Sequence, residues 1–178
     1  MAGLDPVIPC REVREMFTAP PRRRDDRITP AMTHLAMSMT KMTAAEIDAF
    51  LDAEFPQIHH GGKTYHVEAV GLLTARLRCD YHEKLIRPGG TISGPTMMAL
   101  ADLALYVAIL AQIGPVGLAV TTNLAFNFLR KPGQTGLIGE CRLIKLGKRL
   151  AVGEVAIYSD GSPDMVCHAT GTYSMPDR

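Results

Sequence analysis

The sequence carries a single charged residue, Asp102, in the long stretch between Arg87 and Arg130. A carboxylate is seldom buried in apolar surroundings unless a partner neutralises it or the protein uses it chemically. Two interpretations are therefore open: a structural carboxylate in a buried pair, and a functional one that acts as a general base or nucleophile. No basic residue lies near Asp102 in the same stretch, which favours the functional interpretation.

Two short glycine-containing segments precede this acid, Gly89-Gly90 and Ser93-Gly94-Pro95. Ser93 is placed to cap a following helix, and Pro95 fits the first helical turn, where a missing N–H costs nothing. The N–H groups at such a helix start favour negative charge. Taken alone these residues indicate only a turn and a cap, because their spacing matches neither a P-loop nor a dinucleotide-binding fingerprint.

The residues around Asp102 predict a long helix from about residue 94 to residue 112, which Gly114-Pro115 ends. This helix is apolar on all sides, so we expect it to be buried. A strand-like pattern precedes it over residues 65–78, with a bulge or bend at Gly71. Alternating segments with short connections follow it and predict an antiparallel meander over residues 116–128, 137–146, 150–158 and 165–174. The prediction is an α+β domain in which an antiparallel sheet wraps around one long central helix.

The first strand after the helix alternates regularly between apolar and polar residues. This alternation places Thr122 on one face with Leu124, Phe126 and Phe128, and Thr121 on the opposite face. We expect mostly cross-strand hydrogen bonds from the polar side chains. One of them is also a candidate to reach a substrate carbonyl or a water molecule.

The N-terminal part of the chain differs from the rest. Residues 1–40 contain clustered proline and arginine without a steady hydrophobic period, which predicts a flexible arm. Residues 41–178 then form one domain. Thr43 and Glu46 have the spacing of a capping box, which predicts a short helix that Pro56 ends.

The composition argues against several classes of function. A formal net charge of +1 gives no field that would attract nucleic acid or an anionic membrane. The apolar segment 95–113 is just long enough to span a bilayer, but its central acid would cost about 2.5–3.5 kcal/mol there, so a buried helix is favoured. The four cysteines lack CxxC spacing and the six histidines lack a metal-binding pattern. These features predict reduced thiols, a cytoplasmic location and no metal.

The run from Gly89 to Pro95, the Leu-Ala-Asp102 that follows it and the strand from Thr121 to Pro132 resemble the hotdog-fold thioesterases. Within them the chain looks most like the phenylacetate-pathway (PaaI-like) acyl-CoA thioesterases, and the resemblance covers roughly residues 65–176. It implies a hotdog fold, hydrolysis of an acyl-CoA thioester without a further cofactor, and a homodimer or homotetramer with active sites at the dimer interface. Asp102 would act as general base or nucleophile, and the Gly94 N–H of the partner subunit would hold the oxyanion.

The sequence departs from the family pattern around the helix start. Arg87 stands where relatives often have asparagine, Ser93 replaces a histidine, and Pro95 replaces the second glycine. Arg87 either stabilises ionised Asp102, binds a substrate carboxylate or phosphate, or neutralises the acid in an ion pair.

The candidate site has two parts. Its catalytic candidates are Asp102, Gly94 and Ser93. Its candidates for substrate or CoA binding are Arg87, Gly90, Thr122, Arg130, Lys131, Lys148 and Arg149. The last four resemble positions near the phosphates of CoA in relatives, and solvated charges at hairpin ends are the alternative for at least half of them.

The acyl group and the activity itself leave alternatives open. Apolar side chains of the helix suit aromatic and medium-chain acyl groups alike, namely Met97, Met98, Leu100, Leu105 and Tyr106. A non-catalytic acyl-CoA-binding or regulatory protein is the main alternative, which the departures at the helix start favour. A hotdog hydratase or dehydratase is a further one, but it needs a catalytic histidine beside its acid, and the helix start has none.

Overall fold

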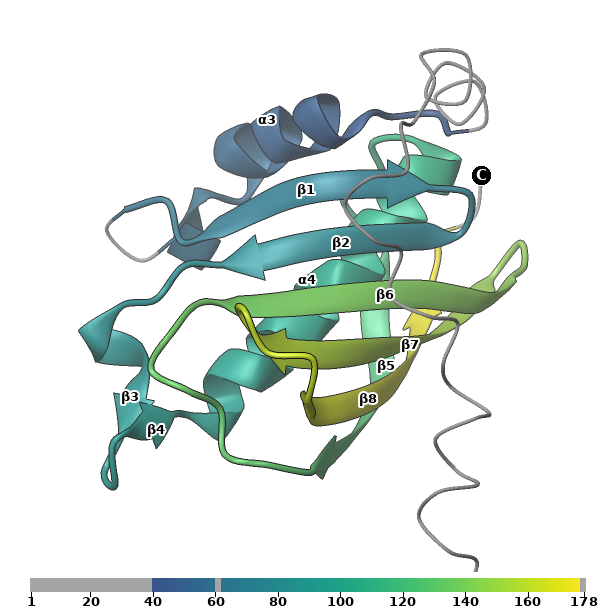
Figure 1. Ribbon diagram of the computed structural model, residues 1–178. Coiled ribbons are helices and arrows are strands. Elements are labelled where there is room, and N and C mark those ends of the chain that lie inside the picture. The colour runs from purple at the N-terminus through teal and green to yellow at the C-terminus, as the bar shows by residue number, and fades with distance from the viewer. Residues whose placement is uncertain (1–39, 60–61, 177–178) are drawn as a thin grey trace, which may run out of the picture. The chain divides into compact units, whose positions relative to one another are not determined.

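A computed structural model describes residues 40–59 and 62–176 of the chain. Except for Thr40, the predicted arm over residues 1–40 lies outside the described residues. The described part forms a six-stranded antiparallel sheet around a long helix, α4 (Gly94–Ile113), which confirms the predicted fold (Figure 1). Across the sheet the strands are β1 (Tyr65–Gly71), β2 (Thr74–Cys79), β6 (Leu137–Leu146), β7 (Leu150–Ser159), β8 (Met165–Ser174) and β5 (Val120–Phe128).

The segment over residues 65–79 forms two strands, β1 and β2, where the sequence predicted one with a bulge or bend. The chain reverses completely after Gly71, which pairs with Thr74 across a two-residue turn. Leu73 in this turn has a φ of 58°, a left-handed value that non-glycine residues seldom adopt, so no glycine marks the reversal at that position. The alternating pattern on both sides is nevertheless that of β1 and β2.

Short elements frame the sheet and the helix. The capping box of Thr43 and Glu46 is present, and it begins α3 (Ala44–Glu54), which the short helix η1 (Pro56–His59) follows. Between β2 and α4 the chain forms η2 (Glu83–Leu85) and a small hairpin of β3 (Ile86–Arg87) and β4 (Thr91–Ile92). This hairpin leads directly into α4.

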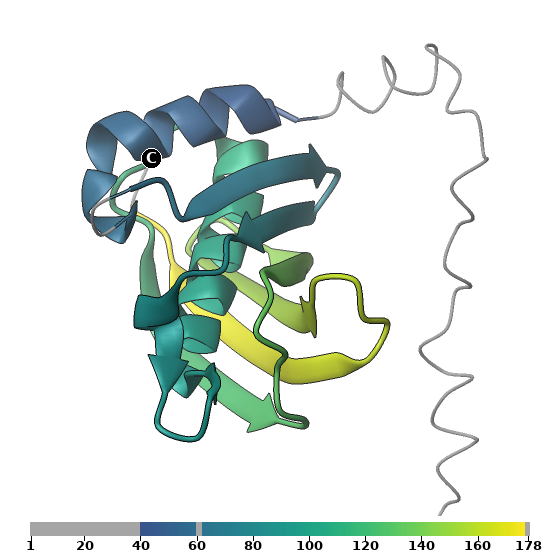
Figure 2. The same ribbon diagram turned by 60° about the vertical axis from the view of Figure 1, so that its left-hand side comes forward.

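The start and end of α4 agree with the predicted signals. The Ser93 hydroxyl accepts a hydrogen bond from the Thr96 N–H, and Gly114 ends the helix with a φ of 92°. The helix lies against the curved sheet and contacts β6, β2, β7 and β1 most extensively (Figure 2). It is long and apolar enough to span a bilayer, yet most of it is buried within the protein, which is the environment of a core helix.

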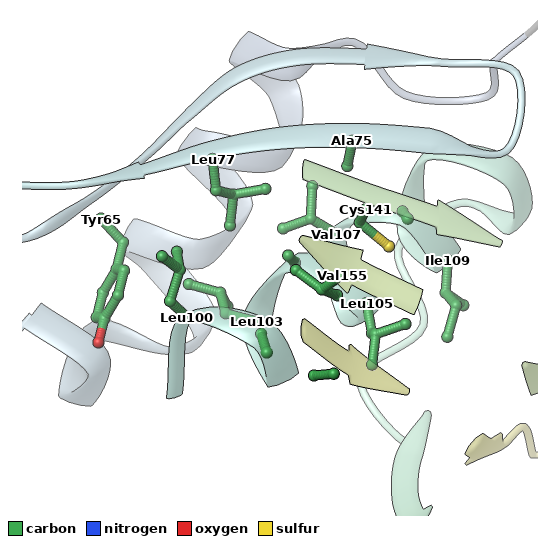
Figure 3. Packing of buried hydrophobic residues seen from close by; sticks show 14 of the residues in the cluster. Tyr65, Ala75, Leu77, Leu100, Leu103, Leu105, Val107, Ile109, Cys141 and Val155 are labelled. Carbon is green, nitrogen blue, oxygen red and sulfur yellow. The ribbon is translucent and has the colours of Figure 1, made fainter. Parts of the chain in front are cut away.

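The core fills the space between α4 and the inner face of the sheet (Figure 3). Leu105 of α4 lies over Gly153 of β7 and Gly171 of β8, which pair with each other across the two strands. A Cβ atom on either glycine would lie within 2.6 Å of a Leu105 methyl carbon. The absence of side chains at these two positions therefore lets the helix approach the sheet closely.

One stripe of α4 is not covered by the other described residues. Pro95, Met98 and Ala99 are exposed, and Asp102 and Tyr106 further along the helix are half-buried. The expectation that the helix is buried on all sides is therefore wrong for a single protomer among the described residues. Asp102 and the exposed apolar residues therefore lie on the same uncovered side of α4.

Candidate active site

Asp102 lies on this open stripe and is held by two hydroxyl groups. Thr121 of β5 donates a hydrogen bond from Oγ1 to Asp102 Oδ1 at 2.6 Å, and Tyr173 of β8 donates from its phenol oxygen to the same Oδ1 at 2.5 Å. No residue of ranges 40–59 and 62–176 donates to Oδ2. The acid is thus not part of an ion pair within the described protomer.

Tyr173 is buried, with 3% of its surface exposed. Burial, and then the neighbouring Asp102 carboxylate, raise the pKa of Tyr173 well above its usual range. The phenol therefore remains a neutral donor throughout the physiological pH range. No pattern in the sequence marks this residue, because it lies in the last strand, far along the chain from Asp102.

Thr121, and not Thr122, faces the acid. A bulge in β5 lets Thr121 pair with Tyr173 and Asn123 pair with Thr172, so that Thr122 is an extra residue between them. The bulge interrupts the regular alternation, so Thr121 lies on the same face as Leu124, and its predicted placement on the opposite face is wrong. The Thr122 hydroxyl instead donates to the Thr172 carbonyl at 3.1 Å.

Gly94 and Ser93 lie at the start of α4, just over two turns before Asp102. The Gly94 N–H belongs to the first helical turn, where N–H groups have no acceptor within the helix, and no acceptor for it occurs among the described residues. A Cβ atom at Gly94 would lie 3.5 Å from the Phe128 ring, which is ordinary contact. Ser93 is occupied by the cap: besides accepting from Thr96 N–H, its Oγ lies 2.9 Å from Thr96 Oγ1.

Arg87 and Gly90 belong to the β3–β4 hairpin. The Gly90 N–H donates to the Arg87 carbonyl at 3.1 Å, and Pro88 followed by Gly89 with a φ of 98° matches a type II turn. The exposed Arg87 side chain forms no ion pair with Asp102 or with any other acid of the described chain. Gln134, which the sequence analysis did not single out, donates to the Gly90 carbonyl at 2.8 Å and ties the hairpin to the loop after β5.

The four basic candidates for phosphate binding divide into two separate pairs. Arg130 and Lys131 follow β5 and line a shallow pocket beside the β7–β8 turn, where Arg130 lies 3.7 Å from Asp164. Lys148 and Arg149 form the β6–β7 turn at the opposite end of the sheet. Strands of this length separate the two ends by about 30 Å, so one protomer does not bring all four cations to one diphosphate.

Apolar side chains are exposed around the edge strand β5, whose outer side pairs with no strand of the described residues. Leu118, Val120, Phe128 and Leu129 are exposed, Leu118 to 73%, and Met98 of α4 lies on the open stripe. An unpaired edge next to exposed apolar side chains is a surface that a second chain can cover. Of the side chains expected to line an acyl pocket, Met97, Leu100 and Leu105 are instead buried in the core, and Met98 and Tyr106 reach the open side.

The histidines of the described chain serve structural contacts. His59, His66 and His168 each lie beside a carboxylate, and His82 accepts from the Lys84 N–H. Residues 40–59 and 62–176 contain no group of three or more His, Cys, Asp or Glu placed to hold a metal ion. None of His59, His66, His82 and His168 contacts Asp102.

Comparisons with known proteins agree with this architecture. Residues 89–166 match the family model described as "Thioesterase superfamily". A "putative esterase" of Saccharolobus solfataricus is 30% identical over 128 residues, which cover 72% of this chain and 76% of that protein. The crystal structure of a "putative thioesterase" from Silicibacter sp. is 40% identical, with a TM-score of 0.70, and the match covers 77% of this chain and 94% of that chain.

More distant solved structures support the fold alone. A variant of the phenylacetic acid degradation protein PaaI of Thermus thermophilus is 22% identical, with a TM-score of 0.57 over 72% of this chain and 100% of that chain. Zebrafish thioesterase superfamily member 2 is 15% identical, with a TM-score of 0.66 over 76% of this chain and 99% of that chain. The family model, the Saccharolobus relative and the Silicibacter structure agree with the sheet, the central helix and the acid on its open stripe. The chain therefore has the hotdog fold and belongs to the thioesterase superfamily.

Proposed function

We propose that the protein is an acyl-CoA thioesterase in which Asp102 activates the attacking oxygen. The observation that carries this proposal is the state of Asp102: a half-buried carboxylate on the central helix, with two donors on Oδ1 and none from the described chain on Oδ2. Such a carboxylate has a free oxygen that can accept a proton from water. A structural buried pair, the competing interpretation, would require a cationic partner, and none reaches Asp102 within the described protomer.

The proposed reaction uses two positions of α4, the N–H at its start and Asp102 near its middle. Asp102 takes a proton from a water molecule, whose oxygen bonds to the thioester carbonyl carbon. The Gly94 N–H of a partner subunit stabilises the oxyanion, as N–H groups at a helix start do for developing negative charge. The C–S bond then breaks, and the CoA thiolate takes the proton from Asp102. Direct attack by Asp102 as a nucleophile is the other form of the same proposal.

The proposed assembly is a homodimer, or a pair of such dimers as a tetramer, in which the β5 edges and the open stripes of α4 face each other. The exposed apolar residues beside β5 support this arrangement because they would be covered in it. Met98 and Tyr106 would then contact the acyl group, which suits aromatic or medium-chain acyl-CoA. We expect no cofactor besides the CoA of the substrate, because the proposed steps use only water and groups of the chain. We also expect the enzyme to be cytoplasmic.

The test compares the wild type with Asp102→Asn on a panel of aromatic and medium-chain acyl-CoAs, measured by release of free thiol. We expect Asp102→Asn to lower kcat by at least about 100-fold. Asp80→Asn, which removes an exposed carboxylate beside His66, is the matched control and is expected to retain activity. Full activity of Asp102→Asn would contradict the mechanism.

The alternative function, non-catalytic acyl-CoA binding, is favoured by the occupied Ser93 hydroxyl and by Arg87 at the hairpin. Saturable binding of acyl-CoA to the wild type without thiol release would support it. Arg87→Ala separates the roles of this arginine in the enzyme. A raised KM at constant kcat indicates contact with the substrate phosphate or carboxylate, whereas a raised kcat indicates that Arg87 neutralises Asp102 across the interface.

A further inference from the structure

We propose that Tyr173 is a positioning residue for Asp102: its hydroxyl holds Oδ1, so that Oδ2 is the oxygen that takes the proton from water. This inference rests on the proposed function of Asp102. It assigns different roles to the two oxygens of the acid, and it adds a residue from the last strand of the sheet to the site.

The first support is the geometry of the contact. The Tyr173 hydroxyl lies 2.5 Å from Asp102 Oδ1 and 2.8 Å from the Asp102 backbone carbonyl oxygen. One phenol therefore contacts both the side chain and the backbone of the same residue. Thr121, the cross-strand neighbour of Tyr173, donates to the same Oδ1 at 2.6 Å. Two donors from neighbouring strands thus converge on one carboxylate oxygen.

The second support is the rigidity of the phenol. Tyr173 is buried, and its ring stacks on Tyr106 with a centroid distance of 6.5 Å and an interplanar angle of 16°. Its strand β8 is paired on both sides, with β7 and with β5. A donor fixed by its own packing can hold a catalytic group in place without being reoriented during the reaction.

The consequence concerns the rotation of the carboxylate. The terminal torsion of an aspartate is broad and roughly two-fold, so its two oxygens exchange roles when nothing holds them. With Oδ1 bonded to Thr121 and Tyr173, this exchange would break two hydrogen bonds. Oδ2 has no donor in the described chain, and it is therefore the oxygen available to a water molecule on the open side of α4.

The test is Tyr173→Phe, which removes only the hydroxyl. We expect kcat to fall on the order of 10- to 100-fold, as for a misplaced catalytic group, with KM unchanged. Tyr65→Phe is the matched control, because Tyr65 is also a buried tyrosine and lies in β1, away from Asp102. We expect it to leave kcat and KM unchanged. Thr121→Val, which removes the second donor, is an independent variant with the same expected direction.

A double-variant cycle separates positioning from a general structural effect. If Tyr173 acts through Asp102, then Tyr173→Phe has no further effect on the residual rate of Asp102→Asn. An equal fractional loss in both backgrounds would overturn the inference, because it would indicate a smaller folded fraction. The inference would also be overturned if Asp102→Asn lowers kcat while Tyr173→Phe leaves kcat unchanged. A failure of the proposed function looks different: the wild type and Asp102→Asn then have the same rate, and the inference fails with it.

Discussion

Gly94 and Asp102 lie just over two turns apart on α4, and a helix rises by about 12 Å over that distance. An oxyanion donor and a general base must both come within about 3 Å of atoms around one carbonyl carbon. One copy of α4 therefore cannot supply both groups to the same thioester. A second copy that lies antiparallel to the first would bring its helix start next to Asp102, and the open stripe of α4 is the face available for it.

The first prediction tests the oxyanion donor. Gly94→Pro removes the N–H, and Pro is favoured at the first helical position, where Ser93 already has the extended backbone that precedes a proline. We expect the variant to fold and kcat to fall by about 100- to 1,000-fold. Gly94→Ala keeps the N–H and places its Cβ in ordinary contact with Phe128, so it is expected to stay active. Equal rates for the two variants would contradict the assignment.

The second prediction tests the shared site directly. Asp102→Asn and Gly94→Pro chains are mixed, unfolded together and refolded, so that about half of the dimers contain one chain of each kind. Each such dimer has one site with both groups intact, and we expect about one quarter of the wild-type activity. Activity no higher than that of the separate variants would indicate that Gly94 and Asp102 do not act across an interface.

The fold was predictable because its signals are local. The Ser93 cap, the Gly114 end and the apolar run between them, with Asp102 as its one charge, define α4. Alternation marks the four later strands, but only β6, β7 and β8 form the predicted meander, because β5 pairs with β8 and not with β6. The hairpin between β1 and β2 escaped prediction because Leu73, and not a glycine, takes the left-handed conformation in the turn. A reversal without a glycine at that position looks like an irregular strand in the sequence.

The geometry of the candidate site could be anticipated from the sequence only where one residue type carried the signal. Asp102 stands out as the one acid between Arg87 and Arg130, whereas its donor Tyr173 is an ordinary strand residue 71 positions away. Thr121 was placed on the wrong face because a bulge adds one residue to β5, and bulges shift every side chain beyond them to the other face. The distance between the Arg130 and Lys148 pairs follows from the opposite directions of β5 and β6, because each pair comes directly after one of these strands.

The third prediction concerns the close approach of α4 to the sheet. A Cβ atom at Gly153 would lie 2.6 Å from Leu105 Cδ2 and 3.0 Å from the Arg142 carbonyl oxygen. The leucine can move but the backbone cannot, so we expect Gly153→Ala to lower the free energy of unfolding by about 1–3 kcal/mol. Adding Leu105→Val should restore only part of this loss. Urea denaturation measures both, with Gly117→Ala as a control because no atom lies within 4 Å of its added Cβ.

The fourth prediction concerns the pH dependence of stability on the outer face of the sheet. Glu154 accepts hydrogen bonds from Arg142 at 2.5 and 3.0 Å, and His168 lies 3.3 Å from its other oxygen. The hydrogen bond from Arg142 lowers the pKa of Glu154, against the effect of burial and with a further contribution from His168. A folded-state pKa below the unfolded value, about 4.3, means that the ionised carboxylate stabilises the protein above that pH.

Glu154→Gln should therefore lower the free energy of unfolding at pH 7 and have a smaller effect in acid. We expect less than about 1 kcal/mol at pH 7, because the Arg142 side chain is 67% exposed and solvent screens the pair. The difference between the two proteins should shrink as the pH falls below about 4.3 and vanish once the folded-state Glu154 is protonated. Urea denaturation at a series of pH values measures this difference, and added salt should reduce it at pH 7. A difference that stays constant down to pH 3 would show that the ion pair with Arg142 does not stabilise the fold.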